Sequence, residues 1–363
     1  MSIDRICTIG PSSSDKKVLT NLIQHGMTIA RLNFSHGTHE SHRSVIELIK
    51  SICNETGQQI KILGDLQGPK IRIGKMNDEK IILKTGQTFT LLIDEVVGDQ
   101  TQASVDYEGL VKDVKPEDRI LINDGAVELL VTNVDQKSVT TTVKTGGELS
   151  SHKGVNLPGV VTSLPAITEK DEKDIEFLLQ EEIDYIACSF IRQASNIKEI
   201  RSFMDSKKRT STQLVAKIET IEAIRNFQEI CKVTDAVMIA RGDLGVELPF
   251  QWIPMLQKAM ISECNRMDTY VITATQMLQS MVEAPLPTRA EVTDVFQAVM
   301  DGTNAVMLSA ESAAGHYPVQ SIETLKLVSQ FSERAKLKAP FDFADMIELI
   351  NSTEVINDKD HRK

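Results

Sequence analysis

A short apolar run that ends in a small or polar cluster recurs along this sequence. It is found eight times, in RICTIGPS, TIARLNFSHG, IKILGDLQGP, DYIACSFIR, QLVAKIET, DAVMIARGDLG, TYVITATQM and NAVMLSAES. The runs end near residues 10, 33, 65, 189, 218, 241, 275 and 309, so six of the seven intervals are 23 to 34 residues long. Such an interval suits one strand followed by one helix. Eight units of this kind predict an α/β fold, the (β/α)8 TIM barrel.

The remaining interval, between residues 65 and 189, is 124 residues long and leaves roughly ninety for an insertion. The runs IILKTGQTFTLLI and VELLVTNVDQKSVTTTVKTGG are rich in Val, Thr, Ile and Leu and are separated by turn residues. They predict an all-β domain inserted between the third strand and the third helix. We therefore expect a barrel in residues 1–70 and 159–335, a β-barrel-like lid in residues 71–158 and a C-terminal tail in residues 336–363. The two boundaries of the lid are expected to act as hinges.

Charge and composition narrow the class of protein. The formal net charge is −11, which argues against a general affinity for nucleic acid. The five cysteines are scattered without metal-ligand spacing, as expected in a reducing compartment. The sequence opens with no signal peptide, and no apolar run approaches the ~20 residues that span a bilayer. These features predict a cytoplasmic protein that does not associate with membranes.

The ends of the expected strands carry polar side chains. In a barrel of this type, active sites lie at the carboxyl ends of the strands. A turn after the sixth run would also offer backbone N–H groups to an anion. The polar residues at these ends are Arg31, Asn33 and Ser35 in the second run, Asp65, Lys70 and Arg72 in or after the third, Lys217 and Glu219 in the fifth, Arg241, Gly242 and Asp243 in the sixth, Thr275 in the seventh, and Ser309 and Glu311 in the eighth.

Two groups among these residues indicate a chemistry. Glu219 and Asp243 supply hard oxygen ligands on neighbouring strands, and Mg²⁺ favours one or two carboxylates together with substrate oxygens. Arg31, Arg72 and Lys217 form a cationic cluster that suits a phosphate group. Together they predict a site for a phosphorylated or carboxylated small molecule bound through a divalent metal.

Several of these features have simpler structural explanations when each is taken alone. A Lys-x-Glu or an Arg-Gly-Asp sequence is usually part of a solvated loop. Thr288 and Glu291 are three residues apart and favour a helix capping box. Met277 and Met281, at helical spacing, are expected in the core. The functional hypothesis depends on compatible polar groups at many strand ends of one barrel.

The sequence resembles the pyruvate kinase family along nearly its whole length. The matching stretches are CTIGPSS, ARLNFSHGTHE, DLQGPKIR, INDGAVELLV, SHKGVNLPG, SFIRQAS, KIET, MIARGDLGVELP, TATQML, PTRAEVTDV and MLSAESAAGHYP. That family is a (β/α)8 barrel with an inserted β domain, in agreement with the strand count. The resemblance implies phosphoryl transfer from phosphoenolpyruvate to ADP, giving pyruvate and ATP, with Mg²⁺ or Mn²⁺ as cofactor.

The resemblance also implies roles for individual residues. Catalysis is expected from Lys217, Arg31, Thr275 and Arg72, and phosphoenolpyruvate binding from Arg31, Lys217, Gly242, Asp243 and Thr275. Nucleotide contacts are expected from Arg31, Asn33, Ser35, His36 and, from the lid, Lys153. Glu219 and Asp243 are expected to bind Mg²⁺, and Asn33, Ser35 and Asp65 to form the monovalent-cation position.

At four positions the sequence departs from the family pattern. Lys70 stands where many members carry the glutamate that accompanies the use of K⁺. Its ammonium group would supply that positive charge near the monovalent-cation position, so we expect no K⁺ requirement. Gln58 replaces an arginine that contacts the nucleotide, and Ala310 and Ser312 replace the usual Gly and Thr.

The sequence ends soon after the eighth expected helix, whereas typical members continue into a C-terminal domain with an allosteric site. This ending leads us to expect no activation by sugar phosphates, and any oligomer to be a homodimer formed through barrel helices. Two alternatives stay open. One is a Mg²⁺-dependent lyase or mutase acting on phosphoenolpyruvate or pyruvate in the same barrel. The other is a non-catalytic regulatory paralogue.

Overall fold

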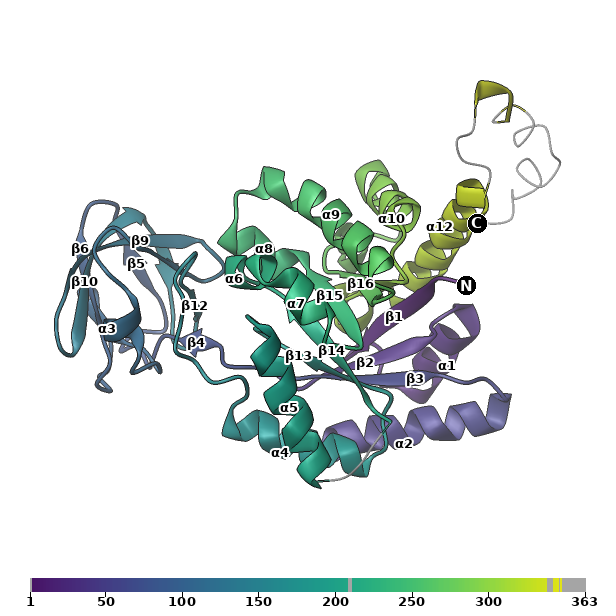
Figure 1. Ribbon diagram of the computed structural model, residues 1–363, viewed down its shortest axis with the longest axis horizontal. Coiled ribbons are helices and arrows are strands. Elements are labelled where there is room, and N and C mark those ends of the chain that lie inside the picture. Colours follow the sequence, from purple (N-terminus) through teal and green to yellow (C-terminus); the bar gives the residue numbers. More distant parts are fainter. Residues whose placement is uncertain (1, 208–210, 338–341, 346, 348–363) are drawn as a thin grey trace.

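The computed structural model describes residues 2–207, 211–337, 342–345 and 347. Eight parallel strands close into a barrel in the order β1-β17-β16-β15-β14-β13-β3-β2, as the sequence predicts (Figure 1). The barrel strands are β1 (Asp4–Ile9), β2 (Ile29–Asn33), β3 (Lys61–Asp65), β13 (Tyr185–Cys188), β14 (Gln213–Ile218), β15 (Ala236–Ala240), β16 (Tyr270–Ala274) and β17 (Ala305–Leu308). Each ends within one residue of the position predicted from its apolar run.

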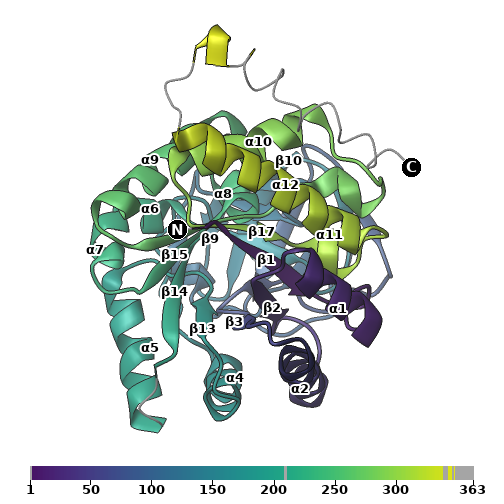
Figure 2. The ribbon, with the colours of Figure 1, turned by 90° about the vertical axis from the view of Figure 1, so that its right-hand side faces the viewer.

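Helices surround the barrel on its outside (Figure 2). They are α1 (Lys16–His25), α2 (His39–Thr56), α4 (Glu169–Gln180), α5 (Ala194–Lys207), α6 (Ile221–Arg225), α7 (Phe227–Cys231), α8 (Arg241–Glu247), α9 (Ile253–Arg266), α10 (Arg289–Asp301), α11 (Ala310–Ala313) and α12 (Pro318–Leu337), with 3₁₀ turns η1 (Phe250–Trp252) and η2 (Gln279–Val282). Helix α12 runs past the boundary expected at residue 335. Most of the tail expected in residues 336–363 lies outside the described residues.

Two apolar layers explain why the strands are apolar throughout. Side chains such as Ile6, Leu63 and Met238 fill the barrel interior, each no more than 1% exposed. The alternate side chains, for example Ile62 and Val237, pack outward against the helices. A parallel strand that is covered on both faces has no solvent-facing positions, so its sequence reads as a continuous apolar run.

Residues between β3 and α4 form a second, mainly antiparallel structure. Its strands are β4 (Ile71–Arg72), β5 (Ile81–Leu83), β6 (Thr88–Leu92), β7 (Gln102–Ser104), β8 (Arg119–Ile122), β9 (Val127–Val134), β10 (Ser138–Thr145), β11 (Gly147–Leu149) and β12 (Gly154–Asn156), with one short helix, α3 (Leu110–Asp113). Seven of these strands form one sheet, and β5 pairs with β11. This part has an apolar core of its own, which includes Phe89 and Val131. The separate core supports our proposal that residues 71–158 are a domain, called here the β domain.

Two chain segments connect the barrel to the β domain, which lies to one side of it (Figure 1). The outgoing segment follows β3 through Gly68 and Pro69, and the returning linker (residues 159–168) leads into α4. Asp171, in the first turn of α4, forms a capping box with Thr168, whose hydroxyl donates to the Asp171 carboxylate. The same carboxylate also accepts a hydrogen bond from the Gly68 N–H at 3.0 Å. One buried carboxylate therefore ties both connections to the barrel.

Local signals in the sequence account for other details. Thr288 and Glu291 form the capping box expected at the start of α10. Met277 and Met281 are fully buried, as predicted. Among the described residues, no helix has both the length and the apolar character needed to cross a membrane.

Candidate active site

Arg31, Asp65 and Lys217 bring charge to the carboxyl ends of three barrel strands. Arg31, on β2, donates from Nε to Asp65 Oδ2 at 2.7 Å and from Nη1 to Thr8 Oγ1 at 2.8 Å. The Lys217 Nζ on β14 lies 3.1 Å from Asp65 Oδ1. Asp65, only 1% exposed, therefore lies between two cations. Burial raises the pKa of Asp65, but the charges of Lys217 and Arg31 outweigh that effect and hold it below its ordinary value.

Lys217 is the centre of this cluster. Besides Asp65, its ammonium group contacts Glu219 Oε1 at 3.0 Å and donates to Ser189 Oγ at 2.7 Å. Burial lowers the pKa of Lys217, but the charges of Asp65, Glu219 and Asp243 more than compensate and raise it above its ordinary value. The side chain is 12% exposed and stays protonated at neutral pH. It presents a fixed positive charge at the barrel mouth.

Glu219 and Asp243 are the two residues predicted to bind the metal, and the charge of Asp243 acts on Glu219. Glu219 is 2% exposed, and its Oε2 accepts a hydrogen bond from the Phe190 N–H at 2.5 Å. Burial and the charge of Asp243 raise the pKa of Glu219, although Lys217 opposes the shift. Two carboxylates that repel each other suit a divalent cation, which would keep both ionised. The donor set therefore fits the metal that the sequence predicts.

Gly242 and Thr275 lie beside this pair. The Gly242 N–H donates to Thr275 Oγ1 at 2.8 Å, and that hydroxyl donates to the Ala274 carbonyl at 2.7 Å. Thr275 has a φ of +68°, a left-handed conformation that is uncommon for a β-branched residue. Such an outlier is typical of functional sites. The backbone after β15 is helix α8 and not the turn that the sequence suggested.

The neighbouring Arg241 has a structural role. Its Nη1 donates to both carboxylate oxygens of Asp294 at 2.7 Å, and its Nη2 donates to the Thr275 carbonyl at 2.6 Å. The side chain thus links α8 to α10 and to the end of β16. All three residues of the Arg-Gly-Asp sequence line one cavity, and the arginine also supports the backbone around it.

A cavity of about 740 Å³ opens next to these residues. It is lined by Gly242 and Asp243 from the barrel, by Asp124 from the β domain, and by Lys70 between them. Its size lies in the range of small-molecule sites. A ligand bound there would contact both parts of the protein.

The predicted nucleotide residues Asn33, Ser35 and His36 follow one another at the end of β2. Asn33 Oδ1 accepts a hydrogen bond from the Ser35 N–H at 3.1 Å, and the His36 N–H donates to the Asn33 carbonyl at 3.2 Å. Asn33 also pairs in register with Asp65 on β3. The structure therefore brings together the three residues expected at the monovalent-cation position.

Three predicted residues lie apart from the Lys217 cluster. Arg72, on β4, donates to the His152 carbonyl at 3.1 Å and does not join Arg31 and Lys217 in the expected cationic cluster. Lys70 packs along β12, where a Cβ on Gly154 would lie 2.7 Å from its Cε. It forms no ion pair or hydrogen bond with Asp65 in the described structure.

Lys153 belongs to the β domain, and its carbonyl accepts a hydrogen bond from the Ile73 N–H at 2.8 Å. Its ammonium group has no hydrogen bond or ion pair within the described part of the chain. It is therefore available to a ligand.

Sequence reasoning missed three contributors to the site. Ser189 and Phe190 follow β13 and bind Lys217 and Glu219, and Thr8 on β1 holds Arg31. In the sequence, Ser189 ends one apolar run and Thr8 is a polar residue inside a different apolar run. Their partners, Lys217 and Arg31, belong to other strands, and a single sequence does not show which strands are in contact.

The fold and the site define a (β/α)8-barrel protein with a charged site at the carboxyl ends of its strands. The family described as "Pyruvate kinase, barrel domain" matches residues 2–322, and the chain belongs to the pyruvate kinase family.

Similar curated proteins support this assignment. A pyruvate kinase of Clostridium perfringens is 45% identical over 90% of this chain and 69% of its own length. Pyruvate kinases of Sporosarcina psychrophila and Geobacillus stearothermophilus are 45% and 46% identical over 91% of this chain. The matched region covers only 57% of the length of these last two relatives.

Proposed function

We propose that this protein transfers the phosphoryl group of phosphoenolpyruvate to ADP and so produces pyruvate and ATP. The observation that carries the proposal is the buried Lys217, held between Asp65 and Glu219 and acted on by the charge of Asp243, which lines the 740 Å³ cavity. The relatives that share this chain's sequence are named pyruvate kinases.

The proposed reaction breaks the bond between phosphorus and the enol oxygen and forms a bond from phosphorus to a terminal oxygen of ADP. Little covalent work falls to the protein, so catalysis rests on alignment and on charge stabilisation. Lys217 and Arg31 stabilise the charge on the phosphoryl oxygens. Because Lys217 is already fixed by three partners, it loses little free energy in reorganising as the reaction proceeds.

The remaining roles are those that the resemblance to the family implies. Glu219 and Asp243 would hold Mg²⁺ or Mn²⁺, which neutralises charge on the substrate oxygens when bound. Gly242, Asp243 and Thr275 would bind the carboxylate end of phosphoenolpyruvate, and Thr275 would face the carbon of the enolate that takes up a proton. Asn33, Ser35 and His36 would contact the nucleotide together with Lys153 of the β domain. Closure of that domain would exclude water, which competes with ADP for the phosphoryl group.

The test is a coupled assay that follows pyruvate formation from phosphoenolpyruvate, ADP and Mg²⁺. In Lys217→Met, kcat is expected to fall by about 10³-fold, the upper range for the loss of one charge-stabilising group. A wild-type protein that consumes phosphoenolpyruvate without making ATP would indicate a lyase or mutase. A protein that binds the ligands without turnover would indicate a regulatory paralogue.

We also propose that the activity does not require K⁺. Lys70 supports this point, because it is a cation that lines the same cavity as Asp243. Assays in potassium-free buffer, with tetramethylammonium chloride to keep the ionic strength constant, are expected to give full activity. A large rise in activity on adding KCl would contradict the replacement of K⁺ by the Lys70 ammonium group.

A further inference from the structure

The returning linker (residues 159–168) is fastened to the β domain on one side. The Ser163 N–H donates to Asp113 Oδ2 at 2.7 Å, and the Ser163 hydroxyl donates to the same oxygen at 3.1 Å. The Tyr107 hydroxyl contacts both residues. Asp113 ends α3, and Tyr107 belongs to the core of the β domain. Any movement of the β domain is therefore transmitted to this linker.

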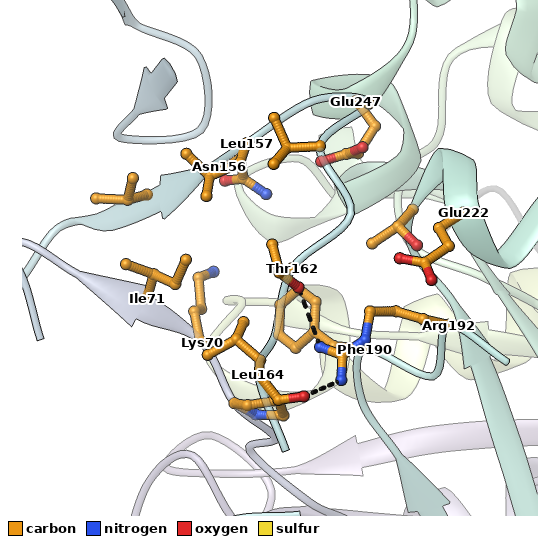
Figure 3. Close-up of a pocket in the computed structure, with 15 residues that line it drawn as sticks. Lys70, Ile71, Asn156, Leu157, Thr162, Leu164, Phe190, Arg192, Glu222 and Glu247 are labelled. Carbon is orange, nitrogen blue, oxygen red and sulfur yellow. Dashed lines mark hydrogen bonds between the residues drawn. The ribbon is translucent and has the colours of Figure 1, made fainter. Parts of the chain in front are cut away.

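Arg192 fastens the same linker to the barrel. Its Nη1 donates to Thr162 Oγ1 at 3.3 Å, and its Nη2 donates to the Leu164 carbonyl at 2.5 Å (Figure 3). The same Nη2 also donates to the Pro165 carbonyl at 3.1 Å. Only 6% of Arg192 is exposed. One planar guanidinium thus binds three acceptors on a short stretch of linker, which the single amine of a lysine cannot reproduce.

The backbone that carries Arg192 is itself fixed. Its N–H donates to Asn196 Oδ1 at 3.1 Å, and its carbonyl accepts a hydrogen bond from Asn226 Nδ2 at 3.0 Å. Two residues earlier, the Phe190 N–H holds Glu219. The loop after β13 therefore supports the proposed metal site with one residue and the linker with another.

Glu222 lies in the same cavity as Arg192 but forms no ion pair with it. The cavity, of about 60 Å³, lies between the linker, the outgoing segment and α6, and we call it the hinge cavity. The Glu222 Oε2 is buried and accepts no hydrogen bond from the residues that the structure describes. Figure 3 shows its carboxylate beside the Arg192 side chain. A buried oxygen without a donor costs about 1–3 kcal/mol, so a donor that reached it would be bound favourably.

The hinge cavity offers few other candidates for that donor. Its charged side chains, within the described chain, are Lys70, Arg192, Glu222 and Glu247. Lys70 lies along β12, on the β-domain side of the cavity (Figure 3). The charge of Glu222 already acts on Arg192, since it raises the pKa of that guanidinium against the larger lowering by burial. Arg192 is thus the group best placed to pair with Glu222.

On the basis of the proposed function, we propose that Arg192 is a positioning residue for the β domain. In the arrangement seen here it holds the returning linker, and Glu222 is a second partner for the same guanidinium when the linker moves away. Arg192 touches neither the cavity at the barrel mouth nor the proposed substrate residues. Its effect on the reaction passes through the placement of Lys153 and through the exclusion of water.

The experiment uses Arg192→Lys, Glu222→Gln and the double variant. Arg201→Lys is the matched control. Arg201 lies on α5, away from the hinge cavity, and its guanidinium forms an ion pair with Asp235 at 2.7 Å. For each protein we measure kcat, KM for ADP, phosphate released from phosphoenolpyruvate without ADP, and the rate at which thermolysin cuts the linker before Val161, which is exposed. The last measurement does not depend on activity.

Arg192→Lys is expected to raise KM for ADP about fivefold with kcat nearly unchanged, because misplacement of a binding group weakens binding without altering the reacting groups. In the same variant, the hydrolysis of phosphoenolpyruvate without ADP and the rate of linker cleavage are both expected to rise. Glu222→Gln removes the competing partner, so linker cleavage is expected to slow. In the double variant this slowing is expected to disappear, since coupled residues show non-additive effects.

The outcomes separate the two proposals. If Arg192→Lys matches the Arg201→Lys control in KM and in cleavage, the positioning role is overturned. If the effects of Arg192→Lys and Glu222→Gln add, the pairing with Glu222 is overturned. If Arg192→Lys does not fold, Thr162→Val removes one acceptor and is expected to change cleavage in the same direction, and no change overturns the role. A wild type without ATP synthesis would overturn the proposed function, while cleavage still decides the positioning role.

Discussion

Glu219 and Glu222 are three residues apart, yet the structure places them in opposite situations. Glu219, at the end of β14, lies at the barrel mouth with Lys217 at 3.0 Å and the Phe190 N–H at 2.5 Å. Glu222, in the first turn of α6, has a buried Oε2 without a hydrogen-bond partner among the described residues. Burial raises the pKa of both carboxyls. Burial alone therefore does not distinguish Glu219 from Glu222, whereas their partners do.

The difference follows from the elements that surround each carboxylate. At the barrel mouth, parallel strands end at a common level. Two cations and two anions therefore lie together at the ends of β2, β3 and β14. In the hinge cavity the only guanidinium among the described lining residues is bound to a linker that connects two domains. A preorganised cluster suits charge stabilisation in a reaction. A carboxylate with an unfilled position suits a part of the protein that moves.

The largest expected effect on stability comes from removing the cation Lys217 from its cluster with Asp65 and Glu219 at the barrel mouth. In Lys217→Met, Asp65 and Glu219 lose a buried partner, and breaking a buried ion pair costs about 3–5 kcal/mol. The free energy of unfolding, measured in urea, is expected to fall by that amount. The control is Lys198→Met, which makes the same exchange at an exposed position of α5 and is expected to change stability by less than about 0.5 kcal/mol. Equal losses of stability in the two variants would show that Lys217 is held by its ion-pair partners no more strongly than a lysine on the surface.

The barrel could be predicted from the sequence because both faces of its strands are covered. Ile239 packs outward and Met238 inward, and both are buried, so the run around them is apolar without alternation. The polar residues at the strand ends could be expected to lie together, because parallel strands in a closed barrel end at the same rim. The structure does bring Lys217, Glu219 and Asp65 together.

Contacts between distant elements could not be predicted. The sequence suggested that Arg72 joins Lys217, but the chain leaves the barrel at Gly68 and carries Arg72 into the β domain. It suggested Lys70 beside Asp65, and the structure places Lys217 there. Arg192 gave no signal, since its three linker acceptors lie 27 to 30 residues earlier in the chain and two of them are backbone carbonyls.

The next effect concerns Glu247, which shares the hinge cavity with Glu222. Burial raises the pKa of Glu247 from 4.5 to about 7, and no cation among the residues described lies close enough to oppose the shift. Between these two pH values the folded protein holds a proton that the unfolded chain has lost, so stability falls as pH rises from about 4.5 to 7. Glu247→Gln cannot lose that proton. Its free energy of unfolding relative to the wild type is expected to improve by about 2 kcal/mol from pH 4.5 to pH 7.5.

Urea unfolding of both proteins at a series of pH values measures this difference. Glu148→Gln serves as the control, because Glu148 lies on the surface of the β domain in an ion pair with Lys80. A difference between wild type and Glu247→Gln that stays constant across the pH range would show that Glu247 titrates as an ordinary carboxyl. The burial of carboxylates in the hinge cavity would then be offset by favourable partners, as it is at the barrel mouth.

The smallest expected effect tests the contrast directly through two equal exchanges. Glu222→Gln removes a charge whose Oε2 has no donor within the described structure. A neutral amide costs less to leave unpaired than a carboxylate, so the free energy of unfolding is expected to rise by about 1 kcal/mol. Glu219→Gln removes a charge that Lys217 and the Phe190 N–H both bind, so stability is expected to fall. Opposite signs for one chemical change, three residues apart, would establish that the partners decide the role of each carboxylate. A loss of stability in both variants would mean that Glu222 has a donor of its own, and the hinge cavity would then be a paired site like the barrel mouth.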